Sequence, residues 1–273
     1  MPVSGAAAPE RTPIAASANL PAIEPPAGPV LPVVEVERDL HTLASVTAGS
    51  VGLSLVGLDG PILTVNDDRQ FMLASVAKLY ILFAYLDRLS QAGRGPSAED
   101  YALMRAMIVV SDNTAASKLW KRIGGPNGLA SFLRARGLEP IHTHDEDEWG
   151  SLRASSAQVA GLISQLLAGR LLDPTSTGLS LSLMSQVSSG QRWGVSAGVE
   201  PGSVTAGLKD GWYPEANGWS INSAGIIVTP RSQYVLVILS DRAPSFREGV
   251  RRVERFAYSV NTFMTRDAGS AHP

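Results

Sequence analysis

The sequence predicts an α+β protein: an antiparallel sheet built from both ends of the chain, flanked by helices, with an all-helical lobe inserted between the two sheet halves. Apolar residues alternate with period two near the start of the chain and again after residue 200, whereas the middle carries apolar residues at helical spacing. After the first 33 residues, about 240 remain, enough for one domain with a large core.

The N-terminal part of this domain predicts a helix followed by a β-hairpin. Residues 34–48 have apolar positions at helical spacing, and residues 50–58 alternate apolar and polar positions. Asp59-Gly60 is a turn pair, and residues 61–65 supply the return strand. We expect residues 1–33, rich in Pro, Ala and Ser, to form a disordered tether.

The central segment, 75–199, predicts the helical lobe. Residues 75–91 form its most apolar helix, with LYILFAYL at the centre, which indicates burial on most sides. Further helices are predicted over 98–110, 114–123, 127–136, 155–171 and, more weakly, 179–187.

The C-terminal segment returns to strands, predicted over 204–208, 219–228 and 233–240, before an amphipathic helix over 246–264. The domain therefore spans 34–268, with an α/β lobe made of 34–74 and 200–268, and a short disordered tail at 269–273. Two distant segments of the chain would share one sheet.

Composition excludes several classes of function. A formal charge of -2 and a pI near 6.1 provide no basic stripe for nucleic acid. No apolar run reaches the ~20 residues of a membrane-spanning helix. The chain has no cysteine, which excludes disulfides and thiolate metal sites, and we expect no cofactor. Tethers such as 1–33 commonly link a membrane anchor to an exported domain. We therefore expect an extracytoplasmic protein that is secreted or is anchored by lipid through a removed N-terminus. The alternative is that residues 1–33 are the flexible terminus of a cytosolic protein.

The lysines are the residues that best indicate a catalytic site. The chain has only four, against nineteen arginines, and two of them complete motifs. Ser75-Val76-Ala77-Lys78 is a Ser-x-x-Lys, Ser111-Asp112-Asn113 follows it, and Lys209-Asp210-Gly211 comes last. This order suggests a serine acyltransferase that works without histidine.

The first motif can activate a serine because residues i and i+3 share a helix face, which brings the Ser75 hydroxyl beside the Lys78 amine. Lys78 can serve as the base if burial, together with the positive charge of Lys209, lowers its pKa. A helix that begins at Ser75 also favours the negative charge that develops on attack, and the Ser75 N–H can form half of an oxyanion hole.

With these motifs the chain resembles the serine β-lactamases and penicillin-binding proteins, most closely the class A branch, over roughly residues 35–265. The resemblance implies that Ser75 is the acylated nucleophile and Lys78 a proton acceptor. It implies that Ser111 relays the proton to the leaving nitrogen and that Asn113 binds the substrate amide. Lys209 would join this network and attract a carboxylate, and the Trp212 N–H would complete the oxyanion hole; Asp210 and Gly211 would lie in the substrate-binding strand.

Three features depart from the class A pattern. The interval between Ser75 and Ser111 is short for that class. Asp210 replaces the usual Thr or Ser, and its charge would repel a substrate carboxylate. The Glu-x-x-Leu-Asn motif, whose glutamate positions the hydrolytic water, has no match between residues 142 and 156. Glu148 is the nearest substitute, so we expect slow or absent hydrolysis of β-lactams.

Each motif also has a structural interpretation, and a Ser-x-x-Lys taken singly is usually structural. Ser111-Asp112-Asn113 could cap a helix, and Asp210-Gly211 could be a hairpin turn. The aromatic residues Trp193, Trp212, Tyr213 and Trp219 could wall the cleft, but core packing is the default.

Two further patterns resemble sites of other classes. Gly194-Val-Ser-Ala-Gly198 fits a nucleophile elbow, but a loop sequence and no usable histidine follow it. His142-x-His144 could bind metal, but a polar loop without metal is the expectation.

The sequence therefore leaves three functions open. The first is a class A-like serine hydrolase of the cell envelope with altered specificity, which acts on a small-molecule or peptidoglycan-type acyl substrate. The second is a non-catalytic envelope-binding protein that retains the fold. The third is a true β-lactamase or D-Ala-D-Ala peptidase. Intact Ser75, Lys78, Ser111, Asn113 and Lys209 favour an enzyme.

Overall fold

A computed structural model describes residues 33–47, 49–143 and 148–265. Its centre is a five-stranded antiparallel sheet in the order β2-β1-β7-β6-β5, which confirms the predicted fold class. The strands are β1 (Ser50–Gly57), β2 (Gly60–Val65), β5 (Val204–Glu215), β6 (Gly218–Val228) and β7 (Gln233–Ala243). A second, two-stranded sheet pairs β3 (Phe71–Met72) with β4 (Arg153–Ala154).

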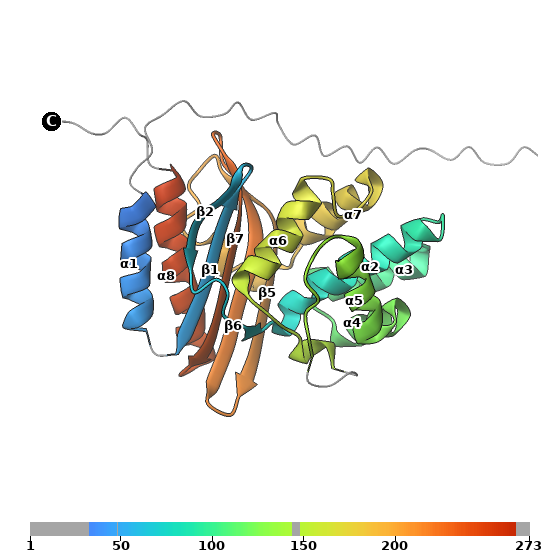
Figure 1. Ribbon diagram of the computed structural model, residues 1–273, viewed down its shortest axis with the longest axis horizontal. Helices are drawn as coiled ribbons and strands as arrows, with labels where there is room; N and C mark the ends of the chain where they lie inside the picture. The colour runs from blue at the N-terminus through green and yellow to red at the C-terminus, as the bar shows by residue number, and fades with distance from the viewer. Residues whose placement is uncertain (1–32, 48, 144–147, 266–273) are drawn as a thin grey trace, which may run out of the picture.

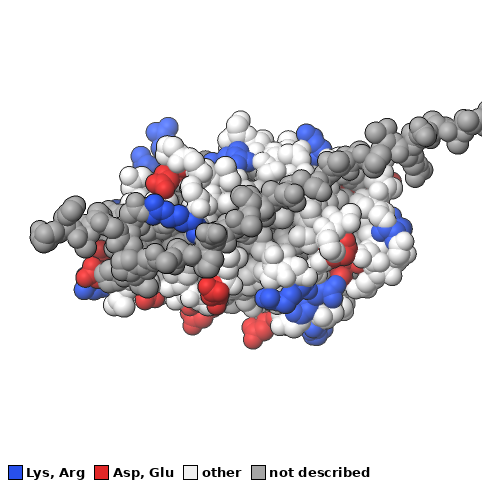
Figure 2. Space-filling model, turned by 90° about the horizontal axis from the view of Figure 1, so that it is seen from above, with Lys and Arg blue, Asp and Glu red and all other residues white. Residues whose placement is uncertain are grey.

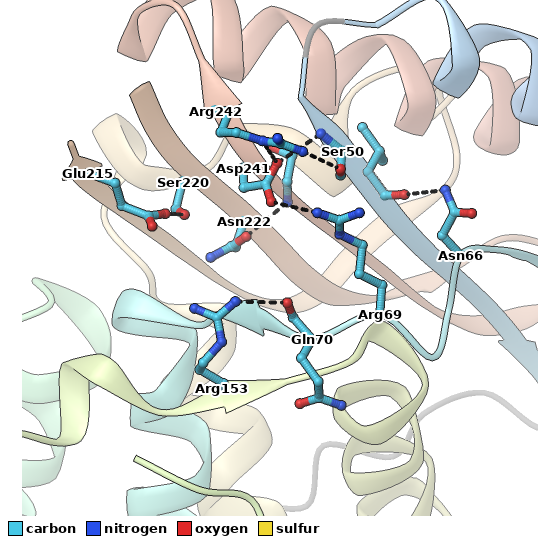
Figure 3. Close-up of polar contacts among 12 residues, drawn as sticks. Ser50, Asn66, Arg69, Gln70, Arg153, Glu215, Ser220, Asn222, Asp241 and Arg242 are labelled. Carbon is cyan, nitrogen blue, oxygen red and sulfur yellow. Dashed lines mark hydrogen bonds and ion pairs between the residues drawn. The ribbon is translucent and has the colours of Figure 1, made fainter. Parts of the chain in front are cut away.

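The pairing of β1 with β7 joins the two ends of the chain, as predicted. It runs from Ser50 opposite Asp241 to Val56 opposite Val235. A carboxylate reinforces its end, because Asp241 accepts a hydrogen bond from the Ser50 N–H at 2.8 Å and from Arg69 at 3.3 Å (Figure 3). Exposed ion pairs of this kind contribute little, about 0–1 kcal/mol each, so the sheet depends mainly on burial.

Helices cover both faces of the sheet (Figure 1). α1 (Val33–Ser45) and α8 (Phe246–Thr265) lie on one side, and α6 (Ser156–Leu167) packs against β1 and β7 on the other. This double cover explains why β6 and β7 are buried along almost their whole length rather than alternating. The inserted segment therefore supplies one helix to the sheet layer as well as building the lobe.

The lobe beside the sheet consists of α2 (Ala77–Gln91), α3 (Ala98–Val109), α4 (Asn113–Ile123), α5 (Gly125–Ala135) and α7 (Pro174–Ser185). α2 is central and is buried on most sides, as its apolar sequence predicts. α7 begins earlier than predicted, because Asp173 caps it by accepting from the Ser176 N–H and Pro174 occupies its first position.

β5 is longer than predicted and runs through the third motif. Lys209, Asp210 and Gly211 pair with Ala224, Ser223 and Asn222 of β6. The interpretation of Asp210-Gly211 as a hairpin turn is therefore wrong. The chain reverses instead at residues 216–217, between Glu215 and Gly218.

Charged side chains are scattered over the surface. In the face that Figure 2 shows, Lys and Arg are interspersed with Asp and Glu on a largely uncharged background. Within the ranges that the structure describes, no helix is long and apolar enough to cross a membrane.

Candidate active site

Ser75 lies at the junction of the sheet and the helical lobe. It sits in a single 3-10 turn, η1 (Ala74–Val76), that leads directly into α2, so the regular helix starts two residues later than predicted. Ala74 before it has a φ of 48°, a left-handed conformation that is rare for a residue with a side chain. Ser75 remains partly exposed between buried Ala74 and Val76. Such local strain, kept at the start of a buried helix, is typical of functional sites.

Lys78 connects the first two motifs. Its side chain is buried, and Nζ donates hydrogen bonds to the Ser111 carbonyl at 2.5 Å, to Ser111 Oγ at 2.9 Å and to Asn113 Oδ1 at 2.8 Å. Three acceptors match the three N–H groups of an ammonium. The structure therefore brings Lys78, Ser111 and Asn113 together, whereas the Ser75 hydroxyl makes no hydrogen bond to another described residue.

The loop before α4 is built to supply those acceptors. Ser111 has a φ of 60°, a second left-handed residue at the site, and it presents both its carbonyl and its hydroxyl to Lys78. Asp112 is the N-cap of α4, because its side chain accepts from the Ala115 N–H at 2.6 Å. The capping interpretation of this motif is correct for Asp112, and it is compatible with a chemical role for its two neighbours.

Two lysines share this buried region. Burial, with a smaller contribution from the Lys209 charge, lowers the pKa of Lys78 from 10.5 to about 7, and Asp112 opposes the shift. Lys209 is itself fully buried on β5, and its Nζ donates to the Asp210 carbonyl at 3.0 Å. Burial lowers the pKa of Lys209 as well. Close to neutral pH, Lys78 can thus exist with or without its proton.

Gly211 allows β5 to approach the nucleophile. A Cβ at this position would lie 2.8 Å from the Ser75 backbone nitrogen and 2.6 Å from the Leu73 carbonyl oxygen, closer than side chains tolerate. Opposite Gly211, Asn222 donates from Nδ2 to the Met72 carbonyl at 2.8 Å. Glycine and asparagine together hold the strand against the segment that carries Ser75.

Asp210 is not where the sequence predicted it to act. Its side chain is 0% exposed and lies on the face of β5 away from the Ser75 segment, accepting from Ser223 Oγ at 2.6 Å and from the Trp193 N–H at 3.3 Å. Burial raises the pKa of Asp210 and favours its uncharged form. The expected repulsion of a substrate carboxylate is therefore wrong, because the strand alternation turns Asp210 to the opposite face from Gly211.

The loop before α6 places an indole over Lys78, which the sequence did not predict. The ring centroid of Trp149 lies 4.9 Å from Lys78 Nζ, and the side chain is 9% exposed. Its neighbour Glu148 is exposed, and its carboxylate forms no hydrogen bond to a described residue. The described part of this loop thus brings an aromatic ring, rather than a carboxylate, to the base.

The two patterns that resemble other sites do not form such sites in the described structure. Residues 194–196 form a single 3-10 turn without a preceding strand or following helix, and Ser196 Oγ donates to the Arg192 carbonyl, so the segment is not a nucleophile elbow. His142 is exposed and its proposed partner, His144, lies outside the described residues. No group of three metal-ligating side chains occurs in the described ranges.

The predicted tryptophans form an aromatic cluster on the face of the sheet that carries Asp210. Trp193, Trp212 and Trp219 each pack against Phe246 of α8, with ring centroids 5.9 to 6.0 Å apart. Tyr213 is 51% exposed and forms no ring contact in the described structure. Phe246 was not part of the predicted set, because its helix is distant in sequence. Packing between β5, β6 and α8 is the role that these contacts support.

Fold and site together define a protein of the serine β-lactamase and penicillin-binding protein superfamily. The sheet, the helical lobe and a Ser-x-x-Lys lysine bonded to a Ser-Asp-Asn motif at their junction are its characteristic parts. The chain belongs to the Beta-lactamase enzyme family, whose model (Beta-lactamase2) matches residues 95–262.

Comparisons with curated proteins and solved structures give relatives and a shared fold. Proteins named "Putative lipoprotein LppW" from Mycobacterium tuberculosis and Mycobacterium bovis are 26% identical over 203 residues, 69% of this chain. The chain spans 62% of the length of those relatives. The TLA-3 extended-spectrum β-lactamase has a similar fold, with a TM-score of 0.76 at 16% identity over 86% of this chain and 100% of its own. PBP-A gives a TM-score of 0.73 at 22% identity over 89% of this chain and 99% of its own.

Proposed function

We propose that the protein is a serine acyl hydrolase of the cell envelope that forms an acyl-enzyme at Ser75 and hydrolyses β-lactams slowly or not at all. One observation carries the proposal: Lys78 is buried three residues after a partly exposed serine and has a pKa of about 7. A lysine whose pKa lies near neutral pH is suited to accept the proton of a nucleophile.

Acylation would proceed through the groups that surround Lys78. The neutral amine accepts the Ser75 proton as Ser75 Oγ attacks the substrate carbonyl, and for this Lys78 must release one of its contacts to Ser111 or Asn113. The bond between the acyl carbon and the leaving nitrogen then breaks as the Ser111 hydroxyl passes its proton to that nitrogen, and Lys78, bonded to Ser111 Oγ at 2.9 Å, returns the Ser75 proton to Ser111. The Ser75 and Trp212 N–H groups stabilise the oxyanion.

Substrate would bind along β5, which lies against the nucleophile segment at Gly211. Asn113 would hold the substrate amide, and the positive charge of Lys209 would attract an anionic group. Because the Asp210 side chain is buried on the opposite face of β5 and burial favours its uncharged form, it presents no charge to that group. We infer a small-molecule or peptidoglycan-type acyl substrate.

The described part of the loop before α6 supports slow release of the acyl group. A carboxylate that activates water is the usual means of hydrolysing such an ester. Glu148 is exposed and forms no hydrogen bond to a described residue that would direct it to Ser75, so we do not assign it that role. The solved structures include a variant of PBP-A in an acyl-enzyme complex with penicillin G, at 23% identity, which supports the choice of penicillin as a probe.

The proposed location in the cell envelope is supported by the names of the relatives, which call them lipoproteins. We propose an extracytoplasmic protein that is secreted or anchored by lipid. Fractionation of cells that express the full-length gene, with detergent extraction of the membrane fraction, tests this location. Recovery in the cytosolic fraction would contradict it.

The test of the activity combines two readouts on one protein preparation. Intact-mass spectrometry after exposure to penicillin and to small acyl esters should show one adduct per chain, absent in Ser75→Ala. Steady-state hydrolysis of a chromogenic cephalosporin should be slow. No adduct with any probe would favour a binding protein without catalysis, whereas rapid hydrolysis lost in Glu148→Gln would identify a true β-lactamase.

A further inference from the structure

Trp149, whose ring lies over Lys78, is held in place by two contacts. Its Nε1 donates a hydrogen bond to Ser117 Oγ of α4 at 3.1 Å. Three residues later, the Leu152 carbonyl accepts from the Leu73 N–H at 2.8 Å, which ties the loop to the segment just before Ser75. The indole therefore cannot move away from Lys78 without breaking the contact to α4.

The position of this ring is chemically unusual. A cation over an aromatic face is stabilised most when it is shielded from water, and Lys78 is fully buried. Residues 149–151 also pack against residues 74–76, which carry the nucleophile. An apolar ring thus lies over Lys78, which exchanges a proton with Ser75 in the proposed mechanism.

We propose that Trp149 keeps water away from the Ser75 acyl-enzyme and so sets the lifetime of that intermediate. The inference rests on the proposed acylation of Ser75 and deepens it, because it names the residue that separates acylation from hydrolysis. Trp149 contacts Lys78 rather than the acyl group. Its role is therefore to position the Lys78 amine and to exclude water from its surroundings.

The step that Trp149 slows is hydrolysis of the ester. The oxygen of a water molecule attacks the acyl carbon while Lys78 accepts one proton of that water. The bond between the acyl carbon and Ser75 Oγ then breaks, and the proton held by Lys78 returns to Ser75 Oγ. The products are the free acid and the restored serine, and no further reactant is needed.

The experiment measures acylation and deacylation separately. Wild type, Trp149→Ala, Trp149→Phe and Ser117→Ala are each mixed with penicillin and followed by intact mass, first during adduct formation and then after removal of free ligand. The control is Trp219→Phe, which alters a tryptophan in the cluster around Phe246. Thermal melting confirms that each variant is folded; if Trp149→Ala is not, Trp149→Leu replaces it.

We expect Trp149→Ala to shorten the adduct half-life by about tenfold or more, a change of one decade in rate, while the acylation rate changes far less. Trp149→Phe and Ser117→Ala both keep an aromatic ring but lose the hydrogen bond between residues 149 and 117, so both should lie between wild type and Trp149→Ala. The control should be unchanged. A general loss of structure would lower the acylation rate instead of selectively shortening the half-life.

The outcomes distinguish this inference from the proposed function. If wild type forms the adduct but Trp149→Ala and Ser117→Ala leave its half-life unchanged or longer, the role of Trp149 is overturned and acylation at Ser75 stands. If wild type forms no adduct with any acyl probe, both are overturned.

Discussion

Replacing Lys78 by methionine should change the stability of the fold by an amount that depends on pH, with the gain in stability largest at pH 7 and below. In the unfolded chain the lysine has its ordinary pKa of 10.5, whereas burial lowers the pKa to about 7 in the folded protein. Between these values the unfolded state binds a proton that the folded state does not, so wild-type stability falls as the pH is lowered from 10.5 to 7. Below pH 7 both states are protonated and the cost stays constant. The full cost is roughly 5 kcal/mol at about 1.4 kcal/mol per pKa unit.

Methionine removes this cost, but it also removes three hydrogen bonds. The loss of partners for Ser111 and Asn113 should cost about 1–3 kcal/mol, independent of pH in this range. The test therefore depends on how the difference in unfolding free energy between the two proteins changes with pH. The difference in unfolding free energy between Lys78→Met and wild type should grow by roughly 1.4 kcal/mol for each unit that the pH falls between about 10 and 7.

The assay is urea unfolding of both proteins at several pH values in that window. Lys118→Met is the matched control, because it replaces a lysine that is exposed on α4. A flat difference for Lys78→Met, equal to the control, would refute the lowered pKa and with it the assignment of Lys78 as the base.

Three further predictions concern the neighbours of that base. Ser111→Ala should lower the acylation rate by about 100-fold or more in stopped-flow measurements, because it removes the proton relay; a rate near wild type would exclude the relay. Gly211→Ala should destabilise the fold and slow acylation, because its Cβ would clash with the backbone of residues 73–76, and unchanged thermal melting and acylation would contradict this close approach. Asp210→Asn should retain both fold and acylation rate, because burial already favours the uncharged acid, and a large loss in either measurement would show that the carboxylate is needed.

Most of the fold could be predicted from the sequence because local patterns specify its elements. The alternation over 50–58 and the turn pair Asp59-Gly60 specify the first hairpin, and the apolar run of α2 predicts its central place in the lobe. The length of β5 could not be predicted in the same way. Asp210-Gly211 favours a turn locally, and only pairing with Ser223 and Asn222 of a strand later in the chain keeps it extended.

Those residues of the site that belong to the three motifs could be predicted from the sequence. Ordered motifs identified Lys78, Ser111 and Asn113, and the structure brings these side chains together. Motifs do not specify which way a strand residue faces, so Asp210 was assigned to the cleft when it lies behind the strand. Trp149 was missed because its contact with Lys78 depends on the path of a loop, and its partner Ser117 is distant in sequence.

Location of the acyl group on the chain tests the central claim most directly. Trypsin should release residues 70–78, cut after Arg69 and Lys78, and Ser75 is the one hydroxyl side chain in that peptide. After brief exposure to penicillin and an acid quench, peptide mass spectrometry should find the added mass on this peptide, and on none in Ser75→Ala. Added mass on a different peptide, or an unmodified 70–78 peptide under every acylating probe, would contradict the account.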